Sequence, residues 1–255
     1  MSKDISHILE GWDFLPGQPV VRKIETEDGT TKLQLRMDLG LLQMEETGRP
    51  DGKRPFGHET MLAHVEKLLR TYVEVEGSES GFQMTDDDCN RLQIESMQFY
   101  HRRISWLALA EYAGAEADAI HNLRIIELVD AHAPSDHWRD AFVQWRPFVL
   151  LHRTVARARQ AWAKQAYDDA MKLIDEGINE ITEVYRARGR EEDSESGNEI
   201  AYLKKWAEEI EETRPLSLEE RLERELNQAV ELEEFERAAG LRDRLTRLRN
   251  EGLWS

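Results

Sequence analysis

The segment "AVELEEFERAAGLRDRL", residues 229–245, has the pattern of two short helices joined by a turn. Downstream of the turn, apolar residues recur at intervals of three, four and three, which places them on one helix face. These residues are Ala238, Leu241, Leu245 and Leu248. So short a segment buries little apolar surface by itself, so we expect it to pack on another helical surface. That surface is either a partner or the helical core of this chain.

Charge also divides this segment into two halves. Residues 219–234 carry seven acidic residues against two arginines, whereas residues 237–249 carry five arginines against one aspartate. An acidic helix antiparallel to a basic one attracts it. The pattern therefore predicts helix pairing, within one chain or between two copies.

The whole chain has 255 residues, of which 40% are hydrophobic and 33% charged, and its net charge is -17. This composition is typical of a soluble, helix-rich protein, and the acidic excess opposes non-specific binding to nucleic acid. No apolar run approaches the roughly 20 residues of a membrane-spanning helix. The first residues do not resemble a signal peptide. We therefore expect a cytoplasmic location and no membrane contact.

Residues 17–45 contain the one convincing β segment. In "VVRKIETEDGTTKLQLRMD", residues 20–38, two alternating runs flank Asp28-Gly29, a pair suited to a tight turn. Leu33, Leu35 and Met37 share one side of the second run. Because two strands alone are marginally stable in water, we expect this hairpin to lie against the helices.

A loop rich in glycine and proline follows at residues 47–59, "TGRPDGKRPFGHE". Its cations Arg49, Lys53 and Arg54 are candidates for binding an anion or a partner, since turns expose backbone N–H groups. The alternatives are a connector whose arginines pair with nearby acids, and an active site in this loop. His58 and His64 are six residues apart and fall on different helix faces, so no metal site is predicted. The single cysteine, Cys89, excludes an internal disulfide and a multi-cysteine zinc site.

From residue 57 onward the chain is predicted to be almost wholly helical, with a break or kink at Pro147. A short phrase recurs in it: "YAGA" at 112–115, "YDDA" at 167–170 and "FERA" at 235–238. In each, an aromatic residue at a turn is followed three residues later by alanine. This arrangement is typical of packed helical hairpins, in which alanine allows two helices to approach closely.

The first two hairpins, "LALAEYAGAEADAIHNL" and "AWAKQAYDDAMKLIDEGI", resemble tetratricopeptide-like repeats. The two tyrosines are 55 residues apart, whereas a regular array repeats every ~34 residues. The resemblance implies an irregular helical solenoid, and a compact bundle is the alternative. The expected fold class is therefore mainly α: an irregular helical-hairpin bundle with an N-terminal β-hairpin and a C-terminal helical hairpin.

Residues 218–248, with "LERELNQAVELEEFERAAGLRDRLTRL" at 222–248, resemble the UVR (UvrB/UvrC) motif, a short helical hairpin. The resemblance implies protein–protein association, including coiled-coil-like pairing with a second copy, and no chemistry. It implies these partner-binding residues: Leu226, Ala229, Val230, Phe235, Ala238, Ala239, Leu241, Arg242, Asp243 and Leu245. Segments such as "GWDFLPGQ" and "WRPFVLLHRTVARA" also resemble a wider set of bacterial UVR-motif proteins, a likeness that brings no established activity.

A basic stripe is predicted on one helix. Its members, spaced by seven, four and seven residues, are Arg146, Arg153, Arg157 and Lys164. The local balance is +5 over residues 138–164 and -12 over residues 191–236. The stripe is a second candidate anion-binding surface, which would bind the acidic tail, an acidic partner or nucleic acid. Pairing within the chain and a solvated face are the alternatives.

These patterns predict four regions: residues 1–59 with the β-hairpin and basic loop, 60–188 with the tetratricopeptide-like helices, 189–215 with an acidic linker and helix, and 216–255 with the UVR hairpin. The chain has no phosphate-binding "GxxxxGK[ST]" motif, helicase core or recognisable nuclease motif. We therefore predict a non-catalytic interaction or adaptor protein, without enzyme activity, cofactor or metal. The alternative is a DNA-repair accessory that contacts nucleic acid through the basic stripe.

Overall fold

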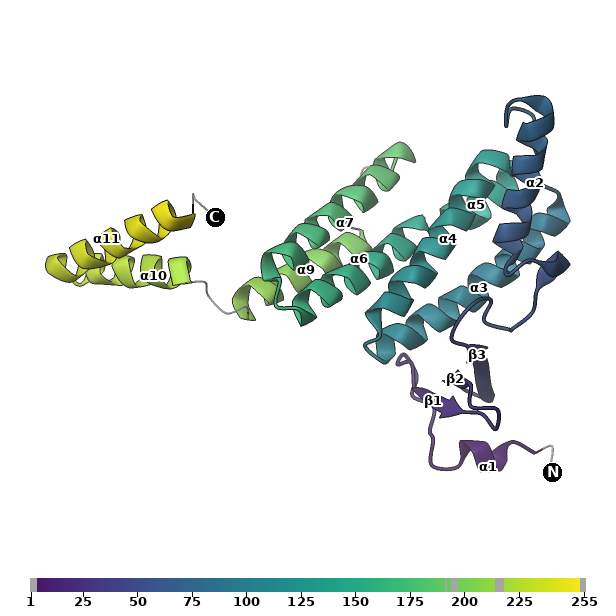
Figure 1. Ribbon diagram of the computed structural model, residues 1–255, viewed down its shortest axis with the longest axis horizontal. Helices are drawn as coiled ribbons and strands as arrows, with labels where there is room; N and C mark the ends of the chain where they lie inside the picture. Colours follow the sequence, from purple (N-terminus) through teal and green to yellow (C-terminus); the bar gives the residue numbers. More distant parts are fainter. Residues whose placement is uncertain (1–3, 191, 194–196, 214–217, 253–255) are drawn as a thin grey trace. The chain divides into compact units, whose positions relative to one another are not determined.

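The computed structural model describes residues 4–190, 192–193, 197–213 and 218–252. Helices make up most of this part of the chain, and a small sheet lies near its N-terminal end (Figure 1). The chain divides into two compact units, residues 1–207 and 208–255, which we describe separately. The helices of the first unit are α1 (Ser6–Leu9), η1 (Pro55–Gly57), α2 (Met61–Glu76), α3 (Asp86–Ala108), α4 (Tyr112–His132), α5 (Asp136–Val143), α6 (Arg146–Ala163), α7 (Tyr167–Ala187) and most of α9 (Asn198–Thr213).

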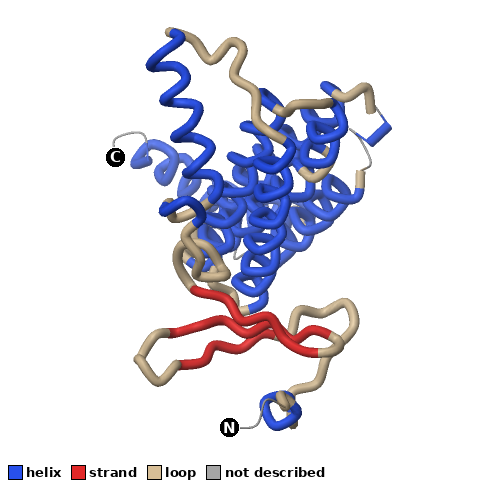
Figure 2. Tube along the Cα trace, turned by 90° about the vertical axis from the view of Figure 1, so that its right-hand side faces the viewer, coloured by secondary structure: helices blue, strands red, loops and turns tan. Residues whose placement is uncertain are grey.

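The sheet is antiparallel and has the strand order β1-β2-β3 (Figure 2). Its strands are β1 (Val21–Glu25), β2 (Thr31–Met37) and β3 (Gly40–Glu45). The predicted hairpin at Asp28-Gly29 is confirmed, with Gly29 in the left-handed region at φ 80°. The prediction of only two strands is incomplete, because the very short Asp38-Leu39 turn leaves β2 and β3 looking like one continuous run in the sequence.

One face of the sheet packs on the helices, as expected from the marginal stability of an isolated hairpin. Its contribution to this core is Leu33, Leu35 and Met44, and the helices contribute Trp106, Ala115 and Ala156. The opposite face is polar and internally bonded. Gln34 accepts a hydrogen bond from Arg22 Nε at 2.8 Å and donates one to Gln43 Oε1 at 2.9 Å. These bonds explain how a glutamine can be buried in the central strand.

The long helices pack in sequence, α2 on α3, α3 on α4, α4 on α6 and α6 on α7 (Figure 1). The expected break at Pro147 is confirmed: α5 ends before it, and Pro147 lies in the first turn of α6, where a missing N–H is tolerated. Helix α9 adjoins α6 and α7, since Arg159 lies over the Trp206 ring and Tyr185 donates to Glu199. Tetratricopeptide-like membership of these helices stays a prediction.

The two elbows predicted from the recurring phrase have the same backbone geometry. Ala110 and Gln165, just before each aromatic residue, adopt positive φ angles of 57° and 62°. The N–H that follows each of them donates back to the carbonyl five residues earlier, at 2.9 Å in the first elbow and 3.0 Å in the second. This is the Schellman ending of a helix, which satisfies carbonyls that would otherwise lack a partner. The alanines of the phrase, Ala115 and Ala170, are fully buried.

Helix α3 carries charged side chains that are buried in the protein. Glu95 is fully buried and accepts hydrogen bonds from the N–H groups of Met61 and Leu62 at 2.6 and 3.0 Å, which are free because they begin α2. Arg102 is 4% exposed and donates to both carboxylate oxygens of Asp118, at 2.9 and 2.6 Å. It also donates to the carbonyls of Glu45 and Gly48, so α3 fixes the end of the sheet.

A third buried charge on α3, Arg103, has a neutral partner. Its Nε donates to His152 Nδ1 at 3.0 Å. Burial lowers the pKa of Arg103 to about 10. Burial, together with the charge of Arg103, lowers the pKa of His152 to about 3. His152 is therefore a neutral acceptor at neutral pH.

The depressed pKa of His152 predicts an acid-sensitive stability. In the unfolded chain this histidine is protonated below about pH 6.5, whereas in the folded protein it stays neutral down to about pH 3. The free energy of unfolding therefore falls as the pH decreases through this window. Between pH 7.5 and 5 this histidine should remove about 1–2 kcal/mol. His152→Gln keeps an acceptor without the titration. In urea unfolding, the free energy of unfolding should decrease less between pH 7.5 and 5 for this variant than for the wild type. Equal decreases would contradict the assignment of His152 as a neutral buried acceptor.

Gly177 of α7 marks the closest approach to α6. A Cβ there would overlap Thr154, lying 2.8 Å from its Cβ. Gly177→Ala should therefore destabilise the protein by about 1–3 kcal/mol in urea unfolding, with partial rescue by Thr154→Ala. The matched control is Gly240→Ala in α11, where a Cβ meets nothing within 4 Å. That change should be neutral or stabilising, because alanine favours helix over glycine.

Candidate partner-binding site

The second unit contains a helical hairpin made of α10 (Leu218–Glu231) and α11 (Phe235–Gly252). The apolar residues of the two helices face each other. Those buried between them are Leu222, Ala229, Ala238, Leu241 and Leu245. Leu226 and Leu248 pack against this cluster and are partly buried. The seam predicted from the spacing of apolar residues is thus filled by the other helix of the same hairpin.

The turn of the hairpin repeats the geometry of the two elbows in the first unit. Glu233 adopts a positive φ of 57°. The N–H of Glu234 donates to the carbonyl of Ala229 at 2.8 Å, and the N–H of Glu233 donates to that of Val230 at 3.1 Å. Phe235 then begins α11. The recurring phrase therefore marks the same type of turn at all three places.

Opposite charges on the two helices attract each other within one chain. Arg249 of α11 pairs with Glu219 at 2.7 Å and with Glu223, both on α10. Next to the turn, Arg237 pairs with Glu234 at 2.9 Å. All these groups are well exposed, so water and salt screen them. The short turn makes the two helices antiparallel, the apolar seam holds them together, and the Arg249 pairs are compatible with this arrangement.

Three large apolar side chains remain outside at the turn. Val230 is 52% exposed, Leu232 60% and Phe235 67%. They lie within six residues of one another along the chain, around the α10–α11 turn. We call them the tip patch. Exposed apolar side chains that form a contiguous patch mark interaction surfaces, so these three residues are a candidate for one.

The hairpin divides the residues predicted to bind a partner into two groups. Leu226, Ala229, Ala238, Leu241 and Leu245 point into its own seam, where an outside partner cannot reach them while it is folded. The others, Val230, Phe235, Ala239, Arg242 and Asp243, are exposed. Leu232 of the tip patch was missed, because the apolar spacing selects one face of each helix and passes over the turn.

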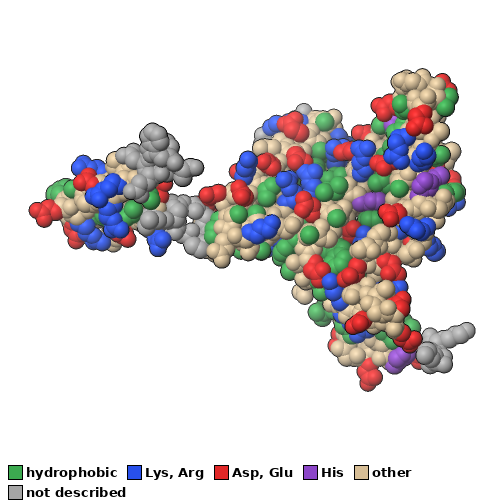
Figure 3. Space-filling view, viewed as in Figure 1, with side chains coloured by type: hydrophobic (Ala, Val, Ile, Leu, Met, Phe, Trp, Pro, Cys, Tyr) green, Lys and Arg blue, Asp and Glu red, His purple; other side chains and the backbone are tan. Residues whose placement is uncertain are grey.

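The arginines of the basic stripe lie on α6 and meet acidic residues of neighbouring helices. Arg153 pairs with Glu180 of α7, and Arg157 lies 3.7 Å from Glu116 of α4. Arg146 lies 3.9 Å from Glu127 of α4, and Lys164 is exposed at the end of α6. Basic and acidic side chains also alternate over the visible face of the first unit (Figure 3). The stripe is therefore largely neutralised within the chain.

The three cations of the loop at residues 47–59 differ in their burial and in their partners. Arg49 is mostly buried, pairs with Asp51 at 3.0 Å, donates to Gln98 at 3.2 Å and reaches Glu95 at 3.5 Å. It anchors the loop to α3. Lys53 and Arg54 are exposed, and Arg54 lies 3.7 Å from Glu59.

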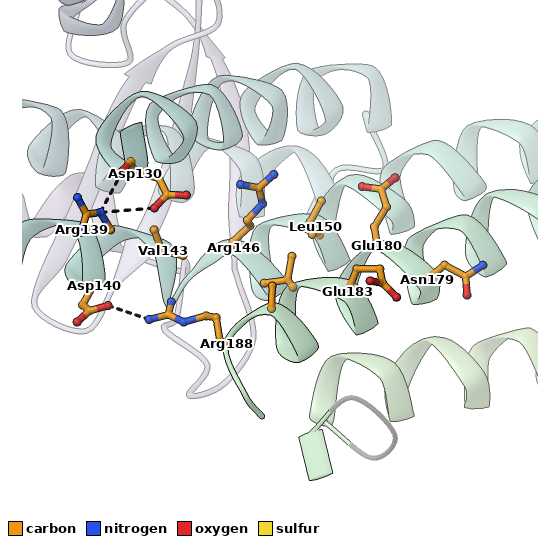
Figure 4. A pocket seen from close by; sticks show the side chains of 12 residues that line it. Asp130, Arg139, Asp140, Val143, Arg146, Leu150, Asn179, Glu180, Glu183 and Arg188 are labelled. Atoms are coloured by element: carbon orange, nitrogen blue, oxygen red, sulfur yellow. Dashed lines mark hydrogen bonds and ion pairs between the residues drawn. The ribbon is translucent and has the colours of Figure 1, made fainter. Parts of the chain in front are cut away.

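A wide, open cavity of about 730 Å³ lies among α5, α6 and α7 (Figure 4). Its charged side chains are mostly satisfied by one another. Arg188 pairs with Asp140 at 2.9 Å, and Arg139 pairs with Asp136 and donates to the carbonyl of Asp130 at 3.0 Å. The loop of residues 47–59 does not line this cavity. We assign no chemistry to it.

No group of three or more His, Cys, Asp or Glu side chains among the described residues could hold a metal ion. None of their helices is both long enough and apolar enough to cross a membrane.

Comparison with known families identifies the C-terminal hairpin. Residues 218–251 match the UVR family model, described as the UvrB/uvrC motif. The two helices and their turn are therefore a UVR motif, as the resemblance in the sequence had implied. This motif serves interaction with protein or DNA in UvrB/UvrC-type proteins. No curated protein matches the chain, and no solved structure does.

The turn of this motif is open to a direct test. Glutamate at a positive φ is strained, whereas glycine is not. Glu233→Gly should therefore stabilise the hairpin by about 1 kcal/mol. Amide hydrogen exchange on the full chain should show slower exchange in α10 and α11 only. Glu225→Gly, in the middle of α10, is the control and should accelerate exchange there. Faster exchange in Glu233→Gly would contradict the assigned turn.

Proposed function

We propose that this protein is a non-catalytic adaptor that binds a helical partner protein through the tip patch of its UVR hairpin. One observation carries the proposal: Val230, Leu232 and Phe235 are each more than half exposed on a hairpin whose own seam is already filled. The UVR match supports an interaction role, since the motif has that role in UvrB/UvrC-type proteins.

The energetics favour the patch over the seam as the binding surface. Opening the seam would expose five buried apolar residues before any contact with a partner formed. The tip patch needs no such opening. Covering one large apolar side chain is worth roughly 1.5–3 kcal/mol. Because the three side chains are already partly covered, they supply only several kcal/mol together, which is comparable with the lower end of the cost of association, so further contacts along the hairpin have to add to the interface.

A second copy of the chain is the partner to test first. Each hairpin carries an acidic α10 and a basic α11, with Arg242, Arg244 and Arg247 exposed on the basic one. A twofold pair can place the acidic helix of each copy beside the basic helix of the other. When the twofold axis runs along the hairpins, both tips lie at the same end, and the two tip patches can share the interface. Hairpin pairing of this kind needs no other component.

Nucleic acid is the less favoured partner. The stripe arginines that would bind phosphates are opposed by Glu116, Glu127 and Glu180, and the net charge of the chain is -17. Releasing them for DNA would leave those acids unpaired beside the phosphates. We therefore propose a protein partner.

The test uses a Leu232→Ser, Phe235→Ser double variant of the full chain. If the patch mediates self-association, light scattering should give a wild-type mass above 29.7 kDa that rises with concentration. The double variant should dissociate at least about tenfold more readily, because two large apolar side chains are lost from the interface. Hydrogen exchange of α10 and α11 should stay unchanged, since neither residue belongs to the seam.

The matched control is Leu39→Ser, which removes another highly exposed leucine, 93% accessible, from the turn between β2 and β3. It should leave the mass unchanged. A wild-type protein that is monomeric at every concentration would exclude the second copy as partner. Immobilised wild type and double variant would then be compared for capture of lysate proteins, and identical capture would refute the tip patch as a binding surface.

A further inference from the structure

A second cavity, of about 250 Å³, lies between α3, α4, α5 and α6 of the first unit. Four aromatic side chains line it, together with aliphatic ones: Tyr100, Phe142, Trp145 and Phe148. The Tyr100 and Phe148 rings lie 6.0 Å apart, and those of Trp145 and Phe148 lie 6.4 Å apart, both tilted. Trp145 is 57% exposed and stands at the rim. Such walls suit a flat apolar ligand, and the volume limits it to a small one.

Three polar side chains also line this cavity, and each has a buried atom without a hydrogen-bond partner. These atoms are Nη1 of Arg103, Oδ1 of Asn122 and Oγ of Ser96. Arg103 is 1% exposed and Asn122 4%. Buried polar atoms are normally satisfied, because leaving one unpaired costs about 1–3 kcal/mol. Three of them beside one cavity make it a candidate polar site, which a ligand reaches once these side chains shift, since the atoms are almost inaccessible to water.

The protein holds two of these groups in place by their other atoms. Arg103 Nε is bound to His152 Nδ1 at 3.0 Å, and Asn122 Nδ2 donates to the carbonyl of Ser96 at 3.1 Å. The guanidinium and the amide are therefore oriented before any ligand arrives, which reduces the entropy lost on binding. The polar part of the cavity is preorganised.

The charge of Arg103 selects the chemistry of the ligand. Among the residues that the structure describes, no carboxylate forms an ion pair with its guanidinium. The neighbouring Arg102 holds Asp118 instead. The charge of Asp118 raises the pKa of Arg103 only from beyond ion-pairing distance, and a ligand carboxylate would supply a direct partner for the planar donor fork of arginine. A single cation in apolar surroundings matches a monoanion better than a phosphate dianion.

We propose that this cavity binds a small carboxylic acid with a flat aromatic body. The carboxylate accepts from Arg103 and from the Ser96 hydroxyl, the ring lies among Tyr100, Trp145 and Phe148, and Asn122 Oδ1 accepts from a hydroxyl or amine of the ligand. The site lies in the first unit, so it does not depend on the role of the UVR hairpin.

Isothermal titration of the full chain tests the site with three related probes: 2-naphthoate, the neutral 2-naphthamide and 2-naphthyl phosphate. Wild type should bind 2-naphthoate at least about tenfold more tightly than either of the others, the difference expected for one charge-assisted hydrogen bond. Arg103→Met should remove this preference by weakening 2-naphthoate about 10- to 100-fold while leaving 2-naphthamide nearly unchanged.

Trp145→Ala provides a second variant that spares the core, because this tryptophan is exposed at the rim. It should weaken 2-naphthoate and 2-naphthamide alike, by about 2- to 10-fold. Phe235→Ala, which removes an exposed aromatic side chain of the hairpin, is the control and should leave both affinities unchanged.

Absence of saturable 2-naphthoate binding to the wild type would overturn the proposal, and so would equal affinities for 2-naphthoate and 2-naphthamide. Tighter binding of 2-naphthyl phosphate would overturn the assignment of a carboxylate. If Arg103→Met does not fold, the wild-type preference among the probes and the Trp145→Ala titration decide the question.

Discussion

The first unit depends on one constraint: helix α3 buries three charges, Glu95, Arg102 and Arg103, and each of them needs a partner. Glu95 takes the free N–H groups at the start of α2. Arg102 takes Asp118 of α4 and two carbonyls at the end of the sheet. These bonds join α2, α4 and the sheet to a single helix. Because a buried charge left alone costs several kcal/mol, they also fix the register in which those elements meet.

Arg103 satisfies the same constraint only in part. It binds neutral His152, whose pKa its charge helps to lower, and it keeps an unpaired Nη1 beside an aromatic cavity. The fold therefore places an incompletely paired buried cation beside a small cavity lined in part by aromatic side chains. The UVR hairpin presents the opposite situation. Its apolar seam is buried between the two helices, and the large apolar side chains that remain exposed among its described residues are those of the tip patch. The two proposed binding surfaces therefore differ in kind: one is a polar cavity and the other an exposed apolar patch.

Several features could be predicted because they depend on neighbours along the chain. The aromatic-to-alanine phrase located three turns that share one hydrogen-bond pattern, and the 3-4-3 spacing located the α11 face that is buried. The third strand was not predicted, because its turn is only two residues long. Arg103 was not predicted either, although a signal existed. It lies four residues after Phe99 and three before Trp106, so helical spacing places it on their buried face.

The sequence by itself determined the helical character of the chain, the position of its turns, and the UVR hairpin with its acidic and basic halves. All of these follow from local spacing, turn chemistry and charge order. Tertiary structure alone decided which surfaces are left to bind anything. The arginines of the α6 stripe form ion pairs with acidic residues of α4 and α7. The apolar seam of the hairpin is buried between its own two helices. Helix α3 places an arginine at the wall of a cavity that also has aromatic side chains. The physical reason is that burial and pairing depend on residues distant in sequence, whose positions only the folded chain defines.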